Sequence, residues 1–327
     1  MTSELSACAL KQYLATLPGS TDSGRYRCTI HAQVFNSSLR LSHRERHHAI
    51  RLFSMPNLTP ERVTELNEFG ESDAWANYFL SSPPEFVQKY RLEAKRIGSV
   101  WVTMIPELDW SFFNRIVGLG VGETATESML DDAVAILQNA GCKNYMAQIS
   151  PLAQVNDVPE WLDVRGFTKG RNWAKVYRGN ASAPFVPTDL RVEAIGGEQA
   201  DAFADVALTA FGMPPELRPL ITGVVGKTGW CHYLAFDDEQ PVAAGTMYVS
   251  ADVAWLGFGC TLESHRNRGA QGALFARRIQ DGLLLGCKWF VTETGEDTPD
   301  SPNPSYRNML RTGFELAYLR RNYVHQL

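Results

Sequence analysis

The chain has 327 residues, of which 44% are hydrophobic and 20% are charged, so it is globular and long enough for two domains of ordinary size. Its net charge of −5 argues against a general nucleic-acid or membrane-surface binder, because both need an excess of Lys and Arg. The six cysteines form no C-x-x-C pair, which predicts reduced thiols and no metal site. With no signal peptide and no apolar run of 18 residues, we expect a cytoplasmic protein.

The first half of the chain shows strands and a helix by periodicity. Apolar runs predict strands at 99–105, 112–121, 144–150 and 172–178. Met129, Ala133, Ile136, Leu137 and Ala140 recur at helical spacing and predict an amphipathic helix between the second and third strands. Residues 1–60 precede this pattern, and we expect them to pack on the first domain as an extension.

The second half repeats the pattern after a small, polar, proline-containing stretch at 179–190. Strands are predicted at 231–236, 241–250 and 253–259, and they are followed by a helix at 272–283. A strand at 289–294, a helix at 305–314 and a last strand at 315–324 complete this half. Strand meanders that feed a helix and then another strand indicate a mixed α+β fold, with a mostly antiparallel sheet flanked by helices.

The two halves share landmarks in the same order, which indicates a tandem duplication. Gly118-Leu119-Gly120 corresponds to Gly257-Phe258-Gly259, and the tripeptide Gly-Cys-Lys occurs at 141–143 and again at 286–288. Arg165-Gly166-Phe167 corresponds to Thr312-Gly313-Phe314. We therefore predict a first domain at 61–180, a linker at 181–189 and a second domain at 190–327.

The copies differ most where the helix begins. The first copy carries Glu123, Glu127, Asp131 and Asp132, whereas the second has an insertion and carries Arg266, Arg268, Arg277 and Arg278. Backbone N–H groups at a glycine-started helix, reinforced by guanidinium groups, form an anion site. We expect a phosphate or pyrophosphate to bind near Gly269 in the second copy only, with Arg277 and Arg278 as surface charges. P-loop and dinucleotide-binding glycine patterns are absent.

This segment resembles the GNAT-type N-acetyltransferase superfamily. The superfamily motif (Gln/Arg)-x-x-Gly-x-(Gly/Ala) reads here as Arg266-Asn267-Arg268-Gly269-Ala270-Gln271, with Gln271 departing at the last position. The resemblance covers 190–327 and, in a degenerate form, 60–178. It implies acetyl-CoA as co-substrate, with its pyrophosphate on the helix start and its pantetheine arm along a strand that splays from its neighbour. The cofactor-binding residues it implies are Cys260, Thr261, Leu262, Arg266, Asn267, Arg268, Gly269, Ala270, Gln271, Gly272, Ser305 and Asn308.

Acyl transfer to an amine needs a base, a polarised carbonyl and a proton for the leaving thiolate. Glu263 and Glu293 are the candidate bases, and a backbone N–H near Leu262 is the candidate donor to the carbonyl. The family often places a tyrosine where this chain has Met309. Tyr306, one turn earlier, is the candidate general acid.

The resemblance implies an N-acetyltransferase that acts on the amine of a small molecule or peptide by direct attack in a ternary complex. A non-catalytic acyl-CoA sensor is the alternative that Met309 favours. A tandem transferase using aminoacyl-tRNA is a third reading, and the acidic net charge weighs against it. The acceptor itself is not specified, although Phe211, Pro214, Pro215 and Trp230 lie where the family usually recognises it.

Overall fold

The structure is a computed structural model that describes residues 58–108, 110–153 and 157–326. The extension predicted at 1–60, with Cys8 and Cys28, lies almost wholly outside the described residues. Pro60–Leu327 form one compact unit.

The elements of the first half begin with a long helix that the sequence patterns did not predict. In chain order they are α3 (Pro60–Leu80), α4 (Pro84–Tyr90), β1 (Glu93–Ile97), β2 (Val100–Met104), η1 (Pro106–Leu108), β3 (Arg115–Val117), α5 (Glu127–Ala140), β4 (Tyr145–Ile149), α6 (Val158–Asp163), β5 (Thr168–Lys169) and β6 (Trp173–Arg178). The predicted helix is α5, which is capped by Thr126 at its start and by Gly141 at its end, where φ is 87°. Glycine adopts this left-handed conformation without steric cost.

The second half contains every strand and helix that its periodicity predicts. Its elements are β7 (Arg191–Ile195), η2 (Gly197–Gln199), α7 (Ala200–Phe211), η3 (Pro215–Leu217), α8 (Arg218–Thr222), β8 (Trp230–Asp237), β9 (Gln240–Ser250), β10 (Val253–Thr261), η4 (Glu263–His265), α9 (Ala270–Leu284), β11 (Trp289–Gly295), α10 (Pro304–Arg311) and β12 (Glu315–His325). α10 begins at Asn303, whose side chain accepts hydrogen bonds from the N–H groups of Ser305 and Tyr306.

All strands belong to one mixed, mostly antiparallel sheet, which confirms the predicted α+β class. The strand order is β1-β2-β3-β4-β12-β6-β11-β10-β9-β8-β7, with β5 paired to β12. Only β3 with β4 and β10 with β11 are parallel pairs among the described strands. The segments β2-β3-α5-β4-α6-β6 and β9-β10-α9-β11-α10-β12 follow the same order along the chain, which supports the predicted repeat.

The last strand of each half lies in the part of the sheet that the other half builds. β6 comes from the first half but pairs with β11, from Phe290↔Arg178 to Gly295↔Trp173. β12 comes from the second half but pairs with β4, from Arg321↔Ile149 to His325↔Tyr145. The domain boundaries predicted from sequence therefore run through a sheet whose two halves have exchanged strands, and they stay a prediction.

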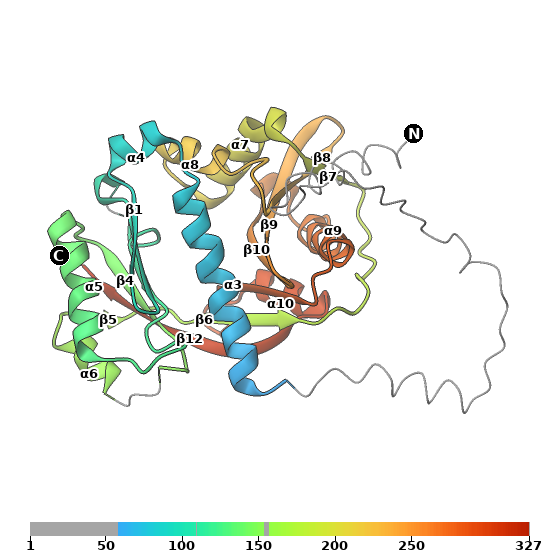
Figure 1. The fold of residues 1–327 in the computed structure, drawn as a ribbon. Coiled ribbons are helices and arrows are strands. Elements are labelled where there is room, and N and C mark those ends of the chain that lie inside the picture. The colour runs from blue at the N-terminus through green and yellow to red at the C-terminus, as the bar shows by residue number, and fades with distance from the viewer. Residues whose placement is uncertain (1–57, 109, 154–156, 327) are drawn as a thin grey trace, which may run out of the picture. The chain divides into compact units, whose positions relative to one another are not determined.

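The helix α3 lies over the middle of this sheet, between the green strands of the first half and the orange strands of the second in Figure 1. It contacts β1 and β2 on one side and β9, β10 and β11 on the other. It is buried on most of its faces, including polar Asn67, Glu68 and Glu71. This is why no amphipathic stripe reveals it in the sequence.

Candidate active site

The parallel strands β10 and β11 separate midway along their length. They pair from Val253↔Trp289 to Trp255↔Val291, although β10 continues to Thr261 and β11 to Gly295. Beyond Val291, β11 stays paired with β6 on its other side. Oγ1 of Thr292 still donates a hydrogen bond to the carbonyl oxygen of Leu256 at 2.6 Å, but the facing backbone edges are no longer paired, so a slot opens between the strands, as the resemblance implies.

A bulge in β10 lies at the opening of this slot. The register with β9 shifts between Gly257 and Cys260, so Phe258 and Gly259 both stand opposite one residue, and Phe258 has a φ of 48°. Behind the bulge, Nη1 of Arg278 donates hydrogen bonds to the carbonyl oxygens of Gly257 (3.2 Å) and Thr246 (3.0 Å). The bulge is thus held by a side chain from α9.

The prediction that Arg278 is a surface charge was wrong. Its side chain is fully buried, because it lies on the face of α9 that carries Leu274 and Phe275 onto the sheet. Burial lowers the pKa of Arg278 to about 10, so it remains a cation at neutral pH. Its Nη2 has no hydrogen-bond partner in the described part of the chain.

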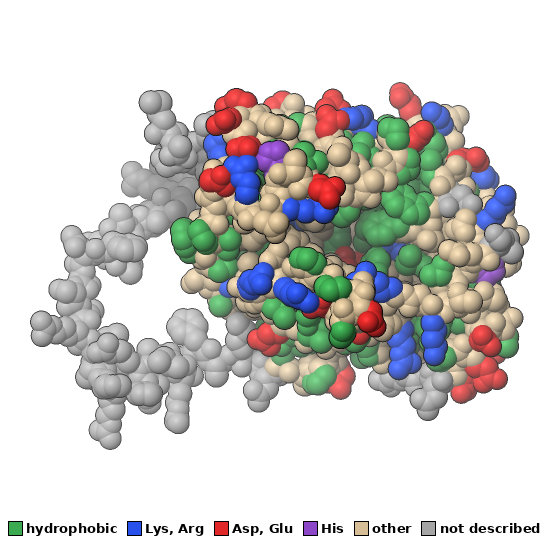
Figure 2. Space-filling view, turned by 180° about the vertical axis from the view of Figure 1, so that it is seen from behind, with side chains coloured by type: hydrophobic (Ala, Val, Ile, Leu, Met, Phe, Trp, Pro, Cys, Tyr) green, Lys and Arg blue, Asp and Glu red, His purple; other side chains and the backbone are tan. Residues whose placement is uncertain are grey.

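A cleft of about 1040 Å³ passes through the slot, at the upper end of the roughly 300–1,000 Å³ of small-molecule sites. It is lined by α9 and α10 on one side of the slot and by α3, β6 and the end of α7 on the other. On the face drawn in Figure 2, hydrophobic side chains gather at a hollow flanked by Lys and Arg, which agrees with this mixed lining.

The start of α9 opens onto the cleft without a capping side chain. Asn267 and Gly269 have φ angles of 67° and 82°, and no side chain accepts a hydrogen bond from the first N–H groups of the helix. In the first half, by contrast, Oγ1 of Thr126 accepts from the N–H of Met129 at the start of α5. N–H groups of a helix start that lack a side-chain acceptor attract an anion. The start of α9 therefore has no side-chain acceptor for its first N–H groups, whereas the start of α5 has one.

Most of the cofactor-binding residues predicted from the motif line the cleft. These are Cys260, Thr261, Arg266, Asn267, Gly269, Ala270, Gln271, Gly272, Ser305 and Asn308. The charged residue of this set is Arg266, which is exposed and whose Nη1 lies 3.8 Å from the carboxylate of Glu263. Of the two motif arginines, Arg266 lines the cleft and Arg268 does not.

Leu262 and Arg268 do not line the cleft. The N–H of Leu262 donates to the carbonyl oxygen of Val242 at 2.9 Å, because β10 stays paired with β9 to its end, so it is not the donor to an acyl carbonyl. The guanidinium of Arg268 forms ion pairs with Asp189 and Asp237. Its side chain thus ties the helix start to the linker and to β8, and only its backbone remains a candidate for anion binding.

Gln271, which departs from the family motif, joins α9 to α10. Its Nε2 donates to Oγ of Ser305 at 2.6 Å, and its Oε1 accepts from Nδ2 of Asn308 at 2.8 Å. A glycine or alanine there could make neither bond. The departure therefore fixes the two helices that border the cleft.

Of the three predicted catalytic residues, the structure brings Glu293 to the cleft. Its carboxylate accepts a hydrogen bond from Nε1 of Trp255 at 3.1 Å and pairs with Nζ of Lys175 at 2.9 Å. Burial raises the pKa of Glu293, as does the nearby Glu71, while Lys175 and Arg320 oppose the rise. A carboxylate with a raised pKa is suited to accept a proton near neutral pH.

Glu263 and Tyr306 are not placed to act there. The side chain of Glu263 is 90% exposed on η4 and does not line the cleft. Tyr306 packs against the core of the second half and does not line the cleft, whereas Met309, which is buried in that core, also lines the cleft. Burial raises the pKa of the Cys260 thiol to about 12, so this cleft residue is not a thiolate nucleophile.

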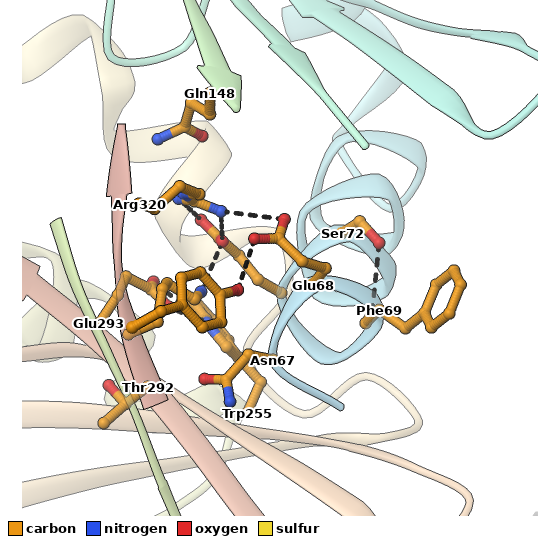
Figure 3. A network of polar contacts seen from close by, with 12 residues as sticks. Asn67, Glu68, Phe69, Ser72, Gln148, Trp255, Thr292, Glu293 and Arg320 are labelled. Carbon is orange, nitrogen blue, oxygen red and sulfur yellow. Dashed lines mark hydrogen bonds and ion pairs between the residues drawn. The ribbon is translucent and has the colours of Figure 1, made fainter. Parts of the chain in front are cut away.

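A buried network of charged side chains lies behind Glu293 (Figure 3). Glu71 of α3 pairs with Lys175 at 2.7 Å and with Nη2 of Arg320 at 3.0 Å, and Arg115 lies 3.4 Å away. These cations hold the pKa of Glu71 well below its usual range despite its burial. The network joins α3 to strands from both halves, and Arg320 comes from the exchanged strand β12.

The sequence patterns missed this network and the aromatic lining of the cleft. A signal was present, since Lys175 and Arg320 interrupt runs that otherwise predict buried strands. A charged residue in a buried strand needs a partner. The partner could not be named, because Glu71 lies in a helix that the patterns did not reveal.

Two further observations concern the described residues only. No group of three His, Cys, Asp or Glu side chains is arranged to hold a metal ion there, and Cys142, Cys231, Cys260 and Cys287 form no disulfide bond. Over the same residues, no helix combines the length and the apolar composition that a membrane span requires.

The fold of this chain is a mixed sheet that splits between two parallel strands, with a helix start facing the split. Two solved structures described as GCN5-related N-acetyltransferases share it, one from Kribbella flavida and one from Sphaerobacter thermophilus. Their TM-scores are 0.52 and 0.51 at 16% and 13% identity, covering 76% and 83% of this chain and 95% and 96% of theirs. The chain therefore has the fold of the GCN5-related N-acetyltransferases.

A third similar structure is a functionally unknown conserved protein from Staphylococcus epidermidis ATCC 12228. Its TM-score is 0.51 at 10% identity, and the match covers 76% of this chain and 99% of that one. No protein-family model matches the sequence, and no curated protein matches it significantly.

Proposed function

We propose that this chain is an acetyl-CoA-dependent N-acetyltransferase whose active site is the cleft between β10 and β11. The observation that carries the proposal is the uncapped start of α9, which faces a cleft that runs through the slot to Glu293. The fold supports acetyl transfer in general. The co-substrate, the residues and the mechanism are part of the proposal.

The cofactor end of the cleft fits a pyrophosphate. The N–H groups of Ala270, Gln271 and Gly272 lie in the first turn of α9, where the helix dipole adds positive potential, and Arg266 supplies a guanidinium. The edge of β10 that faces the slot is no longer paired with β11 at Cys260 and Thr261. It could pair with the amide groups of a pantetheine arm.

Bound acetyl-CoA would supply an activated acyl thioester. Glu293 would accept, directly or through water, the proton that the acceptor nitrogen loses as the N–C bond forms and the C–S bond breaks. The departing thiolate then takes a proton from water, and Glu293 returns its proton to the hydroxide that this leaves, so the reaction yields an amide and a thiol. Arg278 holds the bulge at the slot and places a buried positive charge beside it.

A non-catalytic acyl-CoA sensor is the second candidate, because Met309 offers no proton to a leaving thiolate. Both candidates bind the same ligand in the same cleft. They differ in turnover, so release of free thiol in the presence of amines separates them.

The experiment that tests the binding site is calorimetric titration of acetyl-CoA into the full chain. We expect one site per chain, and a loss of at least about tenfold in affinity for Arg266→Ala. Arg191→Ala is the matched control, since its exposed side chain pairs with Glu193 and Arg191 does not line the cleft. Glu123→Ala, in the first copy, should bind as the wild type does.

Either of two results would refute the site. Absence of binding by the wild-type chain would mean that the start of α9 does not hold the co-substrate. Equal losses in the Arg266 and Glu123 variants would show that binding is not confined to the second copy.

A further inference from the structure

The two sides of the cleft differ in chemistry, because they lie on opposite faces of the sheet. Trp255 of β10 packs against Trp75 of α3, whereas the next residue, Leu256, belongs to the core under α9. Consecutive residues of a strand point to opposite faces. The α9 side carries the uncapped helix start, so the α3 side is left for the acceptor.

The α3 side of the cleft is lined by aromatic rings from separate parts of the chain. Trp75, Trp110, Phe112 and Trp173 form a continuous cluster in which Phe112 touches the other three, with ring centroids 5.6–6.0 Å apart. Phe211, at the end of α7, adds a further ring 6.4 Å from Phe258 in the bulge. Such rings offer broad apolar surface to a ligand.

The charged side chains behind these rings indicate that the part of the acceptor that packs on the rings is uncharged. The guanidinium of Arg115 lies 4.0 Å from the ring centroid of Trp75 and 4.7 Å from that of Phe112. These faces are therefore already occupied by a buried cation, and a second cation on the same rings would be repelled. The three bases Arg115, Lys175 and Arg320 are matched by the three acids Glu68, Glu71 and Glu293, so the network needs no counter-ion from a ligand.

We propose that the acceptor is a primary amine carried on an aromatic ring or a comparably bulky apolar group. The ring would pack among Trp110, Phe112, Trp173 and Phe211, with the amino group directed at Glu293 in the slot. This inference rests on the proposed N-acetyltransferase function and adds the class of substrate.

The test compares amines of similar basicity and different bulk. The full chain, with saturating acetyl-CoA, is assayed for thiol release with 2-phenylethylamine, tyramine, butylamine and spermidine. Burying a phenyl ring is worth roughly 1.5–3 kcal/mol, so kcat/KM for the two aromatic amines should exceed that for butylamine by about 10- to 100-fold.

Variants of the lining separate this inference from a general loss of folding. Phe112→Ala should lower kcat/KM for 2-phenylethylamine about tenfold and by a clearly larger factor than kcat/KM for butylamine, while the affinity for acetyl-CoA reports whether the variant is folded. Phe185→Ala is the matched control, because Phe185 is 91% exposed and outside the cleft.

The outcomes also separate this inference from the function on which it rests. A chain that binds acetyl-CoA and acetylates butylamine or spermidine as well as the aromatic amines keeps the proposed function and overturns the aromatic acceptor. A chain that does not bind acetyl-CoA overturns both.

Discussion

The guanidinium of Arg278 donates a hydrogen bond of 3.2 Å to the carbonyl oxygen of Gly257, where the bulge of β10 begins. Because Arg278 is fully buried, this bond fixes the backbone at the slot from below. The same side chain donates to Thr246 of β9, so it joins both strands to α9.

Arg278→Met should therefore lower kcat more than it lowers affinity for acetyl-CoA. A reacting group displaced by about 1 Å costs about 10²-fold in rate, and that is the loss we expect. Arg278→Lys keeps the charge and should recover part of the rate. Steady-state kinetics with calorimetric binding checks this, and a fall in binding with an unchanged kcat would contradict it.

The pH dependence of the reaction should reflect Glu293. Burial raises the pKa of Glu293 above its ordinary value of 4.5. The carboxylate therefore takes up a proton, and can no longer act as a base, at a higher pH than an exposed glutamate does. We expect kcat/KM to fall as the pH decreases through this raised pKa. In Glu293→Gln the rate should fall by about 10²-fold or more and this acid limb should disappear. An unchanged acid limb in the variant would assign it to another group.

Replacing Glu71 should destabilise the fold strongly. Glu71→Gln leaves Arg320 and Lys175 without their shared carboxylate in the interior, and breaking a buried pair costs about 3–5 kcal/mol. Urea denaturation measures this free energy of unfolding. Glu65→Gln is the control, because Glu65 pairs with Arg62 at the surface and such pairs contribute about 0–1 kcal/mol. Equal effects of the two variants would contradict the role of the network.

The free energy of unfolding should depend on pH just below pH 6.5 because of His232. Burial lowers its pKa from 6.5 to about 3, so the folded state keeps it neutral while the unfolded chain binds a proton below pH 6.5. The unfolded state thus takes up more protons, and stability falls as the pH decreases below 6.5. In His232→Phe the free energy of unfolding should change less between pH 6.5 and 5 than in the wild type. Matching slopes would contradict this.

The sequence predicted local elements well and their pairing poorly. The strands β8, β9, β10 and β11 and the helices α5 and α9 follow from hydrophobic periodicity, which is a local property. The motif at Arg266 to Gln271 likewise placed the candidate binding residues within a single segment, and most of them line one cleft.

What could not be predicted depends on contacts between distant segments. The helix α3 shows no apolar stripe because it is buried on most sides. Its Glu71 is stabilised by ion pairs with Lys175 and Arg320, which lie more than 100 residues away in the sequence. The sequence around Arg278 resembles an exposed helix face, and its burial could not be predicted without knowing that it bonds to the carbonyl oxygen of Gly257 in the bulge. The aromatic lining is also assembled from distant segments, at Trp75, Trp110 and Trp173.

The exchange of β6 and β12 has a consequence for synthesis of the chain. Ile149 at the end of β4 pairs with Arg321 of β12, so the 171 residues at 150–320 must be added before the two strands can pair. At about 5–20 residues per second, translation of that stretch takes roughly 9–34 s. During this time the edge of β4 is without its final neighbour, and unpaired strand edges invite aggregation. The first half thus reaches its native pairing only when the ribosome has nearly finished the second.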